Sequence, residues 1–442
     1  MPPSNDDLAQ VVFTAPANRD VDVLFVVDTA PGSAGAQAKL AAAFPAFVAT
    51  LMAGRARLPN LHVAVISSDL GAGADTATDV PGCRPGGDRG VFQVAPRLAC
   101  PAAGLPARDH FISVVDGVAN LSGGLADALA CVAPLGEAGC AFRQPFAAAL
   151  RALGADGAPA PAENAGFLRA GAFLSVVFLT GDDDCSAPAT FFDPTSRRID
   201  DPLGPLTTFR CAEFGLRCGG VAPSRTMAGA LAGCASAEDG ELSSFADVVA
   251  RLKALKTNRN SVLVAALAAP PTPFTVELAA APTDDPHPWP RVAPSCQDTA
   301  RGTVARPGVR MEQLVYAFGH NGVIESVCDD DFAPSMSAIA QSLSDVLGPP
   351  CLDAPIAPTT GPHGARADCA ITRFADDGGA GVPVPACLDD GDVAPCWTLA
   401  TDAACPRGKL LSFETTTAEP DVARTSAVAC RVCASATDPR CR

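Results

Sequence analysis

The sequence of 442 residues predicts an α/β protein with a mostly parallel central sheet and helices on both faces of that sheet. Short apolar runs recur along residues 21–327, and each run is too short to form a buried helix. Segments with the apolar periodicity of helices lie between several of these runs. Carboxylates or hydroxyls directly follow most runs, as expected for groups presented at the carboxyl ends of parallel strands.

The first apolar run (VDVLFVV) leads through the turn TAPGSAG into a predicted helix over about 36–52. The predicted strands, in chain order, cover residues 21–27, 62–67, 173–180, 261–268 and 322–327. Predicted helices at about 124–133 and 141–153 precede the third strand. The amphipathic segments SSFADVVARLKALK and VRMEQLVYAF precede the fourth and fifth strands. This alternation of strand and helix is typical of a parallel sheet.

Three segments, at about 70–123, 186–242 and 269–307, are rich in Gly, Pro and Cys and have weak periodicity. They are longer than ordinary connections, so we expect disulfide-pinned insertions that leave the sheet. We expect residues 1–18 to form an N-terminal tether and 19–350 to form the sheet-containing domain. Residues 351–442 hold eight cysteines among short apolar runs, which predicts a small disulfide-rich β domain.

The chain carries a formal net charge of −16, and this balance makes nucleic acid and anionic lipid surfaces poor partners. The longest apolar stretch, about 15 residues at 40–54, is shorter than a membrane-spanning helix and contains Pro45. The opening residues, MPPSNDDLAQVVFTAP, lack the basic and apolar regions of a signal peptide. We therefore expect an export signal, and any lipid anchor that accompanies it, to lie outside this sequence.

Cysteine usage predicts an extracytoplasmic protein, in the periplasm, on the outer-membrane surface or secreted. The only C-x2-C pair, Cys430 and Cys433, has no second pair to complete a zinc site, and structural bridges are favoured over a redox role. Proximity suggests the pairs Cys83–Cys100, Cys131–Cys140 and Cys218–Cys234. The full set of candidate disulfide cysteines is Cys83, Cys100, Cys131, Cys140, Cys185, Cys211, Cys218, Cys234, Cys296, Cys328, Cys351, Cys369, Cys387, Cys396, Cys405, Cys430, Cys433 and Cys441.

Oxygen-bearing side chains follow the predicted strands and form the candidate site. The candidates for a binding edge are Thr29, Ser67, Ser68, Asp69 and Thr180. Asp28 is a candidate cation ligand or a helix cap, and Asp329–Asp331 are better explained as a cap of the helix that follows them. Asp182–Asp184 are explained equally well as cation ligands and as a solvated loop.

Roughly residues 20–350 resemble a von Willebrand factor A (VWA) domain. More narrowly, they resemble exported bacterial VWA proteins, often lipoproteins, in which a disulfide-laced domain precedes a Cys-rich tail. The segments that carry this resemblance are VDVLFVVD, LHVAVISSDLGAG, GCAFRQPFAAALRAL, NAGFLRAGAFLSVVFLTGDDDCSA, FRCAEFGLRC and IESVCDDD. The resemblance implies a Rossmann-like fold whose metal-ion-dependent adhesion site binds macromolecules and performs no turnover.

The metal site of that family needs D-x-S-x-S after the first strand, a Thr in a later loop and an Asp after the Thr of a later strand. Asp28 matches, but the serine positions fall on Ala30 and Gly32, with Ser33 one residue late. Residues 136–140 contain no hydroxyl, and the last Asp position holds Gly181, followed by Asp182 and Asp183. The resemblance therefore implies a degenerate site over Asp28, Ser33, Asp182 and Asp183. We expect no cofactor, and Mg²⁺ or Ca²⁺ binding stays as the alternative.

These observations favour a non-enzymatic binding or adhesion module of the bacterial cell envelope, whose partner is an unidentified protein or envelope component. The acidic balance favours a basic or neutral partner. The sequence has no P-loop, no G-x-S-x-G and no H-E-x-x-H, so we expect no enzymatic activity. Two alternatives stay open: a purely structural, disulfide-hardened envelope protein, and a secreted metal-dependent hydrolase that uses the Asp clusters.

Overall fold

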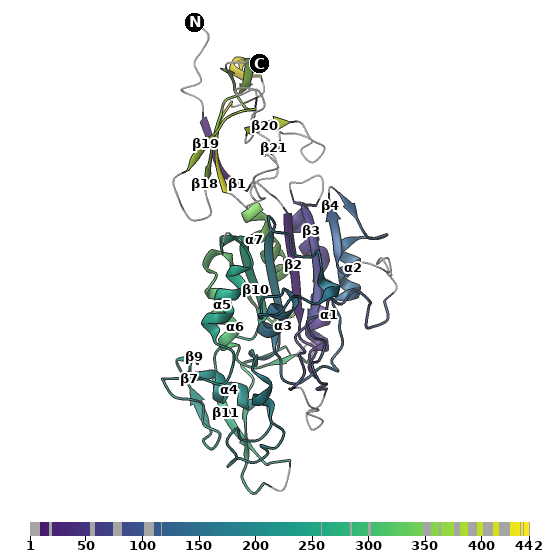
Figure 1. The fold of residues 1–442 in the computed structure, drawn as a ribbon, viewed down its shortest axis with the longest axis vertical. Coiled ribbons are helices and arrows are strands. Elements are labelled where there is room, and N and C mark those ends of the chain that lie inside the picture. Colours follow the sequence, from purple (N-terminus) through teal and green to yellow (C-terminus); the bar gives the residue numbers. More distant parts are fainter. Residues whose placement is uncertain are drawn as a thin grey trace.

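The protein is described here from a computed structural model. It describes residues 9–16, 20–53, 58–73, 82–100, 110–115, 117–257, 259–282, 285–298, 302–347, 355–361, 364–374, 381–387, 396–400, 410–414, 425–433, 435 and 437–441. The molecule is elongated, and a helix-covered sheet forms its middle part (Figure 1). A smaller β-sheet domain, which contains the first and the last residues that the structure describes, lies at one end, and a lobe of inserted segments lies at the other.

The central sheet has seven strands in the order β15-β10-β6-β2-β3-β4-β5. Five of them are parallel: β2 (Asp20–Val27), β3 (Asn60–Ser67), β6 (Phe173–Leu179), β10 (Val262–Ala268) and β15 (Gly322–Ser326). The predicted α/β class with a mostly parallel sheet is confirmed. The order across the sheet is 3-2-1-4-5-6 when six of its strands (β2, β3, β4, β6, β10 and β15) are numbered 1 to 6 along the chain. The strand order therefore reverses between β2 and β6, the position at which open α/β sheets bind ligands.

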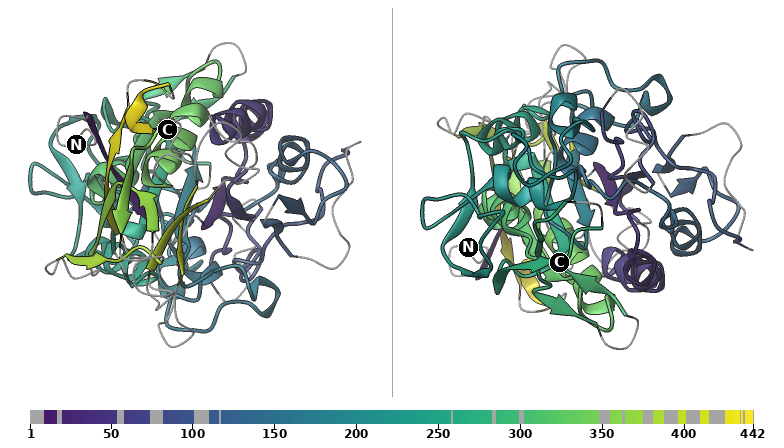
Figure 2. Two further views of the ribbon diagram at one scale, coloured as in Figure 1. Left: turned by 90° about the horizontal axis from the view of Figure 1, so that it is seen from above. Right: turned by 90° about the horizontal axis from the view of Figure 1, so that it is seen from below.

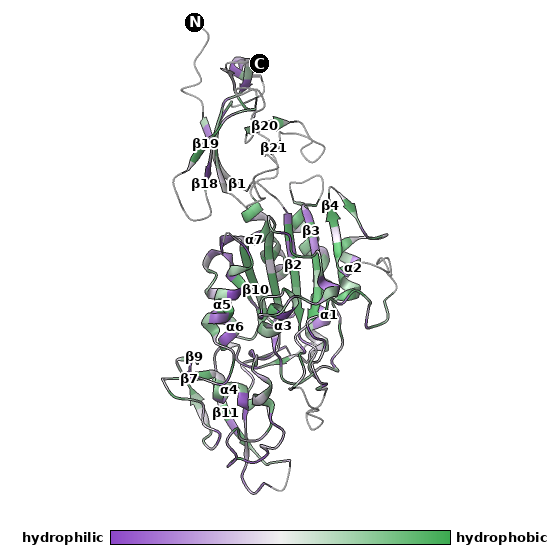
Figure 3. Cartoon of the chain, viewed as in Figure 1, coloured by the Kyte–Doolittle hydropathy of each residue, from purple (hydrophilic) through white to green (hydrophobic). Residues whose placement is uncertain are grey.

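Both faces of the sheet are covered by helices, which explains why its strands read as continuous apolar runs. In β2, Val23, Phe25 and Val27 pack on one face, while Leu24 and Val26 pack on the other. The first face is covered by α1 (Ala34–Met52), α2 (Leu125–Val132) and α7 (Ala333–Leu347). The second is covered by α3 (Pro145–Ala152), α5 (Phe245–Ala254) and α6 (Val309–Tyr316). The hydrophobic strands at the centre of the sheet are visible in Figure 3. Figure 2, which views the molecule down its long axis, shows α1 beside α7.

Among the described residues, α1 alone has the length and hydropathy of a membrane-spanning helix. Its aromatic side chains are fully buried in the core, where Phe44 and Phe47 pack edge-to-face against Phe25 of β2. Pro45 lies inside the helix. The predicted helix at 141–153 begins later than expected, because Pro145 occupies its first turn and leaves residues 141–144 as a loop.

The predicted insertions differ in what they build. The segment at 70–123 does not simply leave the sheet, because β4 (Ile112–Val115) and β5 (Val118–Ala119) add an antiparallel edge to it. The segments at 186–242 and 269–307 combine into one unit, which we call the insertion lobe. Its elements are α4 (Phe209–Gly215), β7 (Leu216–Cys218), β8 (Gly229–Leu231), β9 (Cys234–Ser236), β11 (Phe274–Ala279), β12 (Trp289–Val292), β13 (Cys296–Gln297) and β14 (Val304–Ala305). The two segments are joined by the pairing of β8 with β11.

The C-terminal domain is built around a four-stranded antiparallel sheet of order β1-β22-β18-β19. Its strands are β1 (Ala9–Pro16), β22 (Thr425–Val432), β18 (Cys369–Phe374) and β19 (Val382–Val384). The prediction that residues 1–18 are a tether is wrong for Ala9–Pro16, because all eight residues pair with β22. Two further hairpins are β16 (Pro358–Gly361) with β17 (Gly364–Ala367), and β20 (Cys396–Ala400) with β21 (Leu410–Glu414). Short 3-10 turns occur at Ala162–Asn164, Ala189–Phe192, Arg259–Ser261, Gly319–Asn321 and Pro439–Cys441.

Eight disulfides cross-link the described residues, which confirms the disulfide-rich character. The bridges are Cys83–Cys140, Cys100–Cys131, Cys185–Cys211, Cys218–Cys234, Cys296–Cys328, Cys369–Cys430, Cys387–Cys396 and Cys433–Cys441. The predicted pair Cys218–Cys234 is present, whereas Cys83–Cys100 and Cys131–Cys140 are wrong. The loop after α2 returns to the carboxyl edge of the sheet and brings Cys140 to Cys83, while Cys131 stays on α2 and meets Cys100. Cys351 and Cys405 lie outside the described residues.

Candidate functional site

The predicted edge residues all lie at the carboxyl ends of β2, β3 and β6, but beneath the surface. Thr29, Ser67, Ser68, Asp69 and Thr180 are each at most 2% exposed. Several are held by local hydrogen bonds: Ser67 Oγ donates to Asp88 at 2.5 Å, and Thr180 Oγ1 donates to the Asp182 carbonyl at 2.6 Å. A partner would reach this edge only through a pocket.

Asp28 lies at the switch point, immediately after β2, and is 1% exposed. Its Oδ1 accepts the Ala30 N–H at 2.8 Å. Its Oδ2 accepts the Gly181 N–H at 3.1 Å and the Nε–H of Arg143 at 2.6 Å. Both carboxylate oxygens of Asp28 therefore already have donors, and one of the donors is a positively charged guanidinium.

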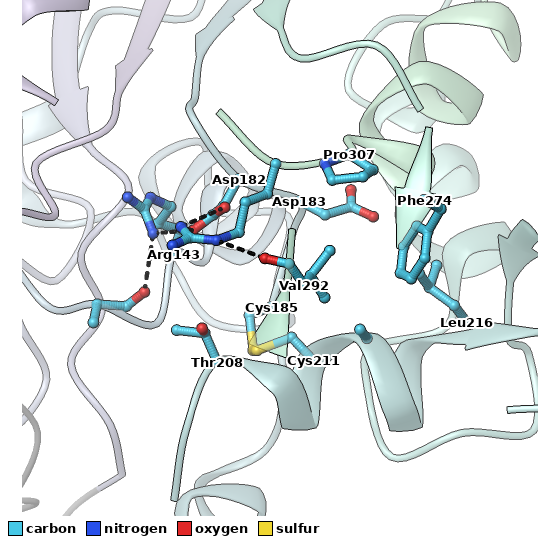
Figure 4. A pocket seen from close by; sticks show the side chains of 13 residues that line it. Arg143, Asp182, Asp183, Cys185, Thr208, Cys211, Leu216, Phe274, Val292 and Pro307 are labelled. Carbon is cyan, nitrogen blue, oxygen red and sulfur yellow. Dashed lines mark hydrogen bonds and ion pairs between the residues drawn. A yellow bond between two sulfur atoms is a disulfide. The ribbon is translucent and has the colours of Figure 1, made fainter. Parts of the chain in front are cut away.

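Arg143 comes from the loop before α3, and its side chain is 9% exposed. Nε donates to Asp28. Nη1 donates to the carboxylate of Asp182, as Figure 4 shows. Burial disfavours the charged guanidinium, but the nearby carboxylates of Asp182 and Asp28 outweigh this effect and raise the pKa of Arg143 above its usual value. The switch point thus contains a permanent cation supplied by the protein.

A second arginine, Arg306 from the insertion lobe, completes the charge network. Its Nη1 lies 3.3 Å from both carboxylate oxygens of Asp182, and its Nε donates to the Val292 carbonyl at 3.1 Å. The side chain of Arg306 is 41% exposed, in contrast to that of Arg143. Asp182 therefore joins a buried arginine of the central domain to a half-exposed arginine of the lobe.

The other two aspartates of the cluster hold helix N-termini. Asp183 accepts the N–H groups of Arg310 and Met311 in the first turn of α6, at 3.0 and 3.1 Å. Asp184 accepts the Phe146 N–H at the start of α3 and the hydroxyl of Ser186. Burial raises the pKa of Asp184, and it raises the pKa of Asp183 to about 7 against the opposing effect of the backbone donors. The sequence alone left two interpretations of Asp182–Asp184, as cation ligands or as a solvated loop. Neither describes the structure, because each carboxylate has a specific protein donor.

The remaining acidic cluster behaves as expected for a helix cap. Asp331 Oδ1 accepts the Ala333 N–H at the start of α7, at 2.9 Å. Asp28, by contrast, does not cap α1 directly, because Ser33 occupies the N-cap position of that helix. The Ser33 hydroxyl accepts a hydrogen bond from the Gln37 side chain at 3.0 Å.

The residues at the switch point do not fit a divalent cation. The two serine positions of the family motif hold Ala30 and Gly32, which offer no side-chain oxygen. The guanidinium of Arg143 lies against both Asp28 and Asp182, so a metal ion would compete with a fixed positive charge. Within the described parts of the chain, no three His, Cys, Asp or Glu side chains are grouped closely enough to hold a metal.

Two pockets share Arg143 and Arg306 as lining residues. The first, of about 480 Å³, faces the insertion lobe and is shown in Figure 4; its walls include Asp183, Leu216 and Phe274. The second, of about 670 Å³, lies at the start of α1, and we call it the α1 pocket. Its lining includes Asp28, Gly32, Ser33, Arg143, Thr303 and Arg306.

Sequence reasoning missed both arginines. One feature of the sequence could have pointed to Arg143: it is a charged residue in the run CAFRQPF, just after residues 136–140. The resemblance places a hydroxyl side chain in those residues, but this sequence has none there. No comparable signal marks Arg306, because its position depends on how the lobe folds.

Comparison with known sequences matches no protein-family model and no curated protein. The geometry itself defines the class: a disulfide-rich protein with an open, mostly parallel α/β sheet and a buried guanidinium at its switch point.

Proposed function

We propose that the protein is a non-enzymatic, extracytoplasmic binding module of the bacterial cell envelope. In this proposal its central domain is a VWA-like domain that binds its partner without a metal ion. The observation that carries the proposal is the guanidinium of Arg143, which lies between Asp28 and Asp182 at the switch point. It supplies internally the positive charge that a cation site would otherwise provide.

Export is supported by the density of cross-links. Eight disulfides in the described residues would be rare in a reducing compartment. The strand order and the helices on both sheet faces support the VWA-like interpretation. A lipid anchor carried outside this sequence remains part of the proposal.

Binding is favoured over hydrolysis by the state of the carboxylates. A hydrolase of the alternative type needs a carboxylate that is free to ligate a metal or to activate water. Asp28 and Asp182 are engaged by arginines, and Asp183 by the N-terminus of α6. These three side chains serve the architecture of the carboxyl edge.

The test has two arms, both on the disulfide-intact chain. Thermal unfolding followed by circular dichroism is expected to be the same in EDTA, Mg²⁺ and Ca²⁺, because a ligand stabilises only a state that it binds. Binding to immobilised envelope extract is expected to be saturable and to persist in EDTA. A melting temperature that rises with either cation would overturn metal independence. Absence of saturable binding would leave the purely structural alternative in its place.

A further inference from the structure

We infer that the outer edge of β8 (Gly229–Leu231) binds an extended, uncharged segment of a partner protein by strand addition. β8 is the last strand of a three-stranded antiparallel sheet of order β12-β11-β8 in the insertion lobe. The lobe that contains β11 lies at the end of the molecule opposite the C-terminal domain (Figure 1). The inference goes beyond the proposed function, because it places a partner on the lobe and not at the carboxyl edge of the central sheet.

The backbone of β8 has hydrogen-bonding groups that the protein itself does not use. The three residues of β8 pair with Val276, Thr275 and Phe274 of β11. Successive residues of an antiparallel strand direct their N–H and C=O groups to opposite edges, so β11 uses only part of the backbone of β8. Within the part of the chain that the structure describes, residues 227–232 make no other backbone hydrogen bond. An extended peptide can therefore pair with this edge through its main chain.

The two edges of this three-stranded sheet differ in how they are protected. The edge formed by β12 carries Pro290, which has no N–H to donate, and Arg291, whose side chain is 65% exposed. Prolines and exposed charges are the usual means by which proteins prevent an edge strand from pairing with another chain. Residues 226–232 contain neither. The sheet is thus protected against a further strand at β12 and open to one at β8.

Exposed apolar side chains lie next to the open edge. Met227, two residues before β8, is 70% exposed, and Val221 is 66% exposed. The turn that contains Val221 is joined to the chain just beyond β8, because the Gly219 N–H donates to the Gly233 carbonyl at 3.2 Å. Apolar side chains of a bound segment would remove the surfaces of Met227 and Val221 from water, which favours binding.

The surface around β8 is uncharged, although the chain as a whole has a net charge of −16. The only charged side chain in residues 219–233 is Arg225. Its guanidinium donates to Glu213 at 2.8 Å and to the carbonyl oxygens of Ile199 and Asp201. A charged segment placed on this edge would lose hydration and gain no new ion pair in return. The edge therefore selects an uncharged segment.

β8 is held in its extended conformation before a partner binds. Leu231 packs against the apolar cluster of the lobe that contains Phe274. The disulfide Cys218–Cys234 fixes the chain three residues after Leu231. Pairing with a strand that is already ordered costs little conformational freedom on the protein side, so main-chain hydrogen bonds can contribute directly to affinity.

A free extended segment fits this edge better than a second copy of the chain does. β8 has three residues. Two such strands paired about a twofold axis would bury far less than the roughly 800 Å² per partner of a stable interface. A flexible segment can pair with β8 and also cover Met227 and Val221, because it does not have to match a second rigid surface.

The probe is an acetylated and amidated peptide of about seven alternating threonine and valine residues, titrated into the disulfide-intact chain by ligand-observed NMR. One comparison peptide has N-methyl groups on two adjacent central residues, which blocks both of its edges. The other has lysine in place of valine. We expect saturable binding of the first peptide and at least tenfold weaker binding of the other two. Equal binding of the N-methylated peptide would overturn strand addition, and equal binding of the lysine peptide would overturn the preference for an uncharged segment.

Two variants locate the binding surface. Met227→Lys is expected to weaken binding of the threonine–valine peptide about tenfold, because it replaces an apolar contact with a charge beside the edge. Val118→Lys is the matched control: Val118 lies on β5, the edge of the central sheet, and is 74% exposed. Hydrogen exchange should slow over residues 227–232 when the peptide is bound. Equal affinities of the two variants, or slowed exchange only in other parts of the chain, would contradict the inference.

Sedimentation velocity tests the alternative occupant. We expect the wild-type chain to stay monomeric, and a dimer that Met227→Lys dissociates would show that the edge binds a second copy instead. The inference and the proposed function also fail in different ways. If envelope extract binds saturably but the threonine–valine peptide does not bind, strand addition is wrong and the proposed function stands. If the peptide binds at β8 but no envelope component binds, the edge stands and the proposed function is wrong.

Discussion

Replacement of Arg143 by methionine is the most direct test of the buried charge network. The substitution keeps a long side chain but removes the guanidinium between Asp28 and Asp182. The side chain of Asp28 is 2% exposed, so the variant would retain a carboxylate that water does not reach. Breaking a buried ion pair in this way typically costs about 3–5 kcal/mol in free energy of unfolding.

The expected change in melting temperature follows from the size of the domain. An unfolding entropy of about 2.1 cal/mol/K per residue, over roughly 330 residues, gives about 0.7 kcal/mol/K. A loss of 3–5 kcal/mol therefore corresponds to a decrease of about 4–7 °C. Circular dichroism at 222 nm is the appropriate signal, because every described α-helix lies within Ala34–Leu347.

The variant is also expected to acquire a response to cations. With the guanidinium removed, Asp28 and Asp182 would face the vacated space without their shared partner, and oxygen ligands of this kind suit Ca²⁺ or Mg²⁺. Either cation should raise the melting temperature of Arg143→Met and leave that of the wild type unchanged. The double variant Arg143→Met/Asp28→Asn should recover about 1–3 kcal/mol, because it also removes the stranded charge.

The control is Arg251→Met, which removes an exposed arginine and should change the free energy of unfolding by about 0.5 kcal/mol or less. If Arg143→Met is as stable as this control, the guanidinium does not hold the two carboxylates. If the double variant recovers nothing, the loss comes from packing and not from charge.

Three further predictions concern pH, the N-terminal strand and the cross-links. Burial holds the pKa of Asp183 at about 7, above the ordinary value of 3.8, so the folded state keeps a proton that the unfolded state releases. Wild-type stability should therefore fall as pH rises from about 4 to 7, and Asp183→Asn should flatten that fall in urea titrations. Deletion of residues 1–16 removes β1 and should lower the unfolding midpoint seen by Trp397 fluorescence, with the helical signal unchanged. Mass spectrometry of a non-reduced digest should recover Cys83–Cys140 and Cys100–Cys131, and recovery of Cys83–Cys100 instead would contradict the structure.

Most of the central sheet could be predicted from the sequence, because its signal is local. A strand buried on both faces must be apolar throughout, and β2, β6 and β10 begin and end within one residue of the predicted ranges. The strands that were missed depend on distant partners. β4 and β5 are short edge strands, and β1 pairs with β22 at the far end of the sequence, so no local pattern identifies them.

The site was predictable only in part, for the same reason. Asp28 is found because it directly follows a strong strand. The role of Asp183 could not be inferred, because its donors lie in the first turn of α6, more than 100 residues later in the chain. Arg143 and Arg306 meet at Asp182 only after two loops have folded against the sheet. Motif spacing identifies the position of a site, but the charge that occupies it is set by tertiary contacts.

The insertion lobe is fixed to the sheet close to the residues that line the α1 pocket. Lys39 of α1 forms a buried ion pair with Asp298 of the lobe at 2.9 Å and donates to the carbonyl oxygens of Val327 and Asp329. The disulfide Cys296–Cys328 links the same parts of the chain. These contacts hold the hairpin of β13 and β14, next to which Arg306 lies, in a fixed position relative to α1. A pocket whose donors are already in place loses little conformational freedom on binding, so its affinity depends on the match of charge and shape. Because the hydroxyls and carboxylates at the strand ends are buried, the insertion lobe would determine which ligand binds at this edge of the sheet.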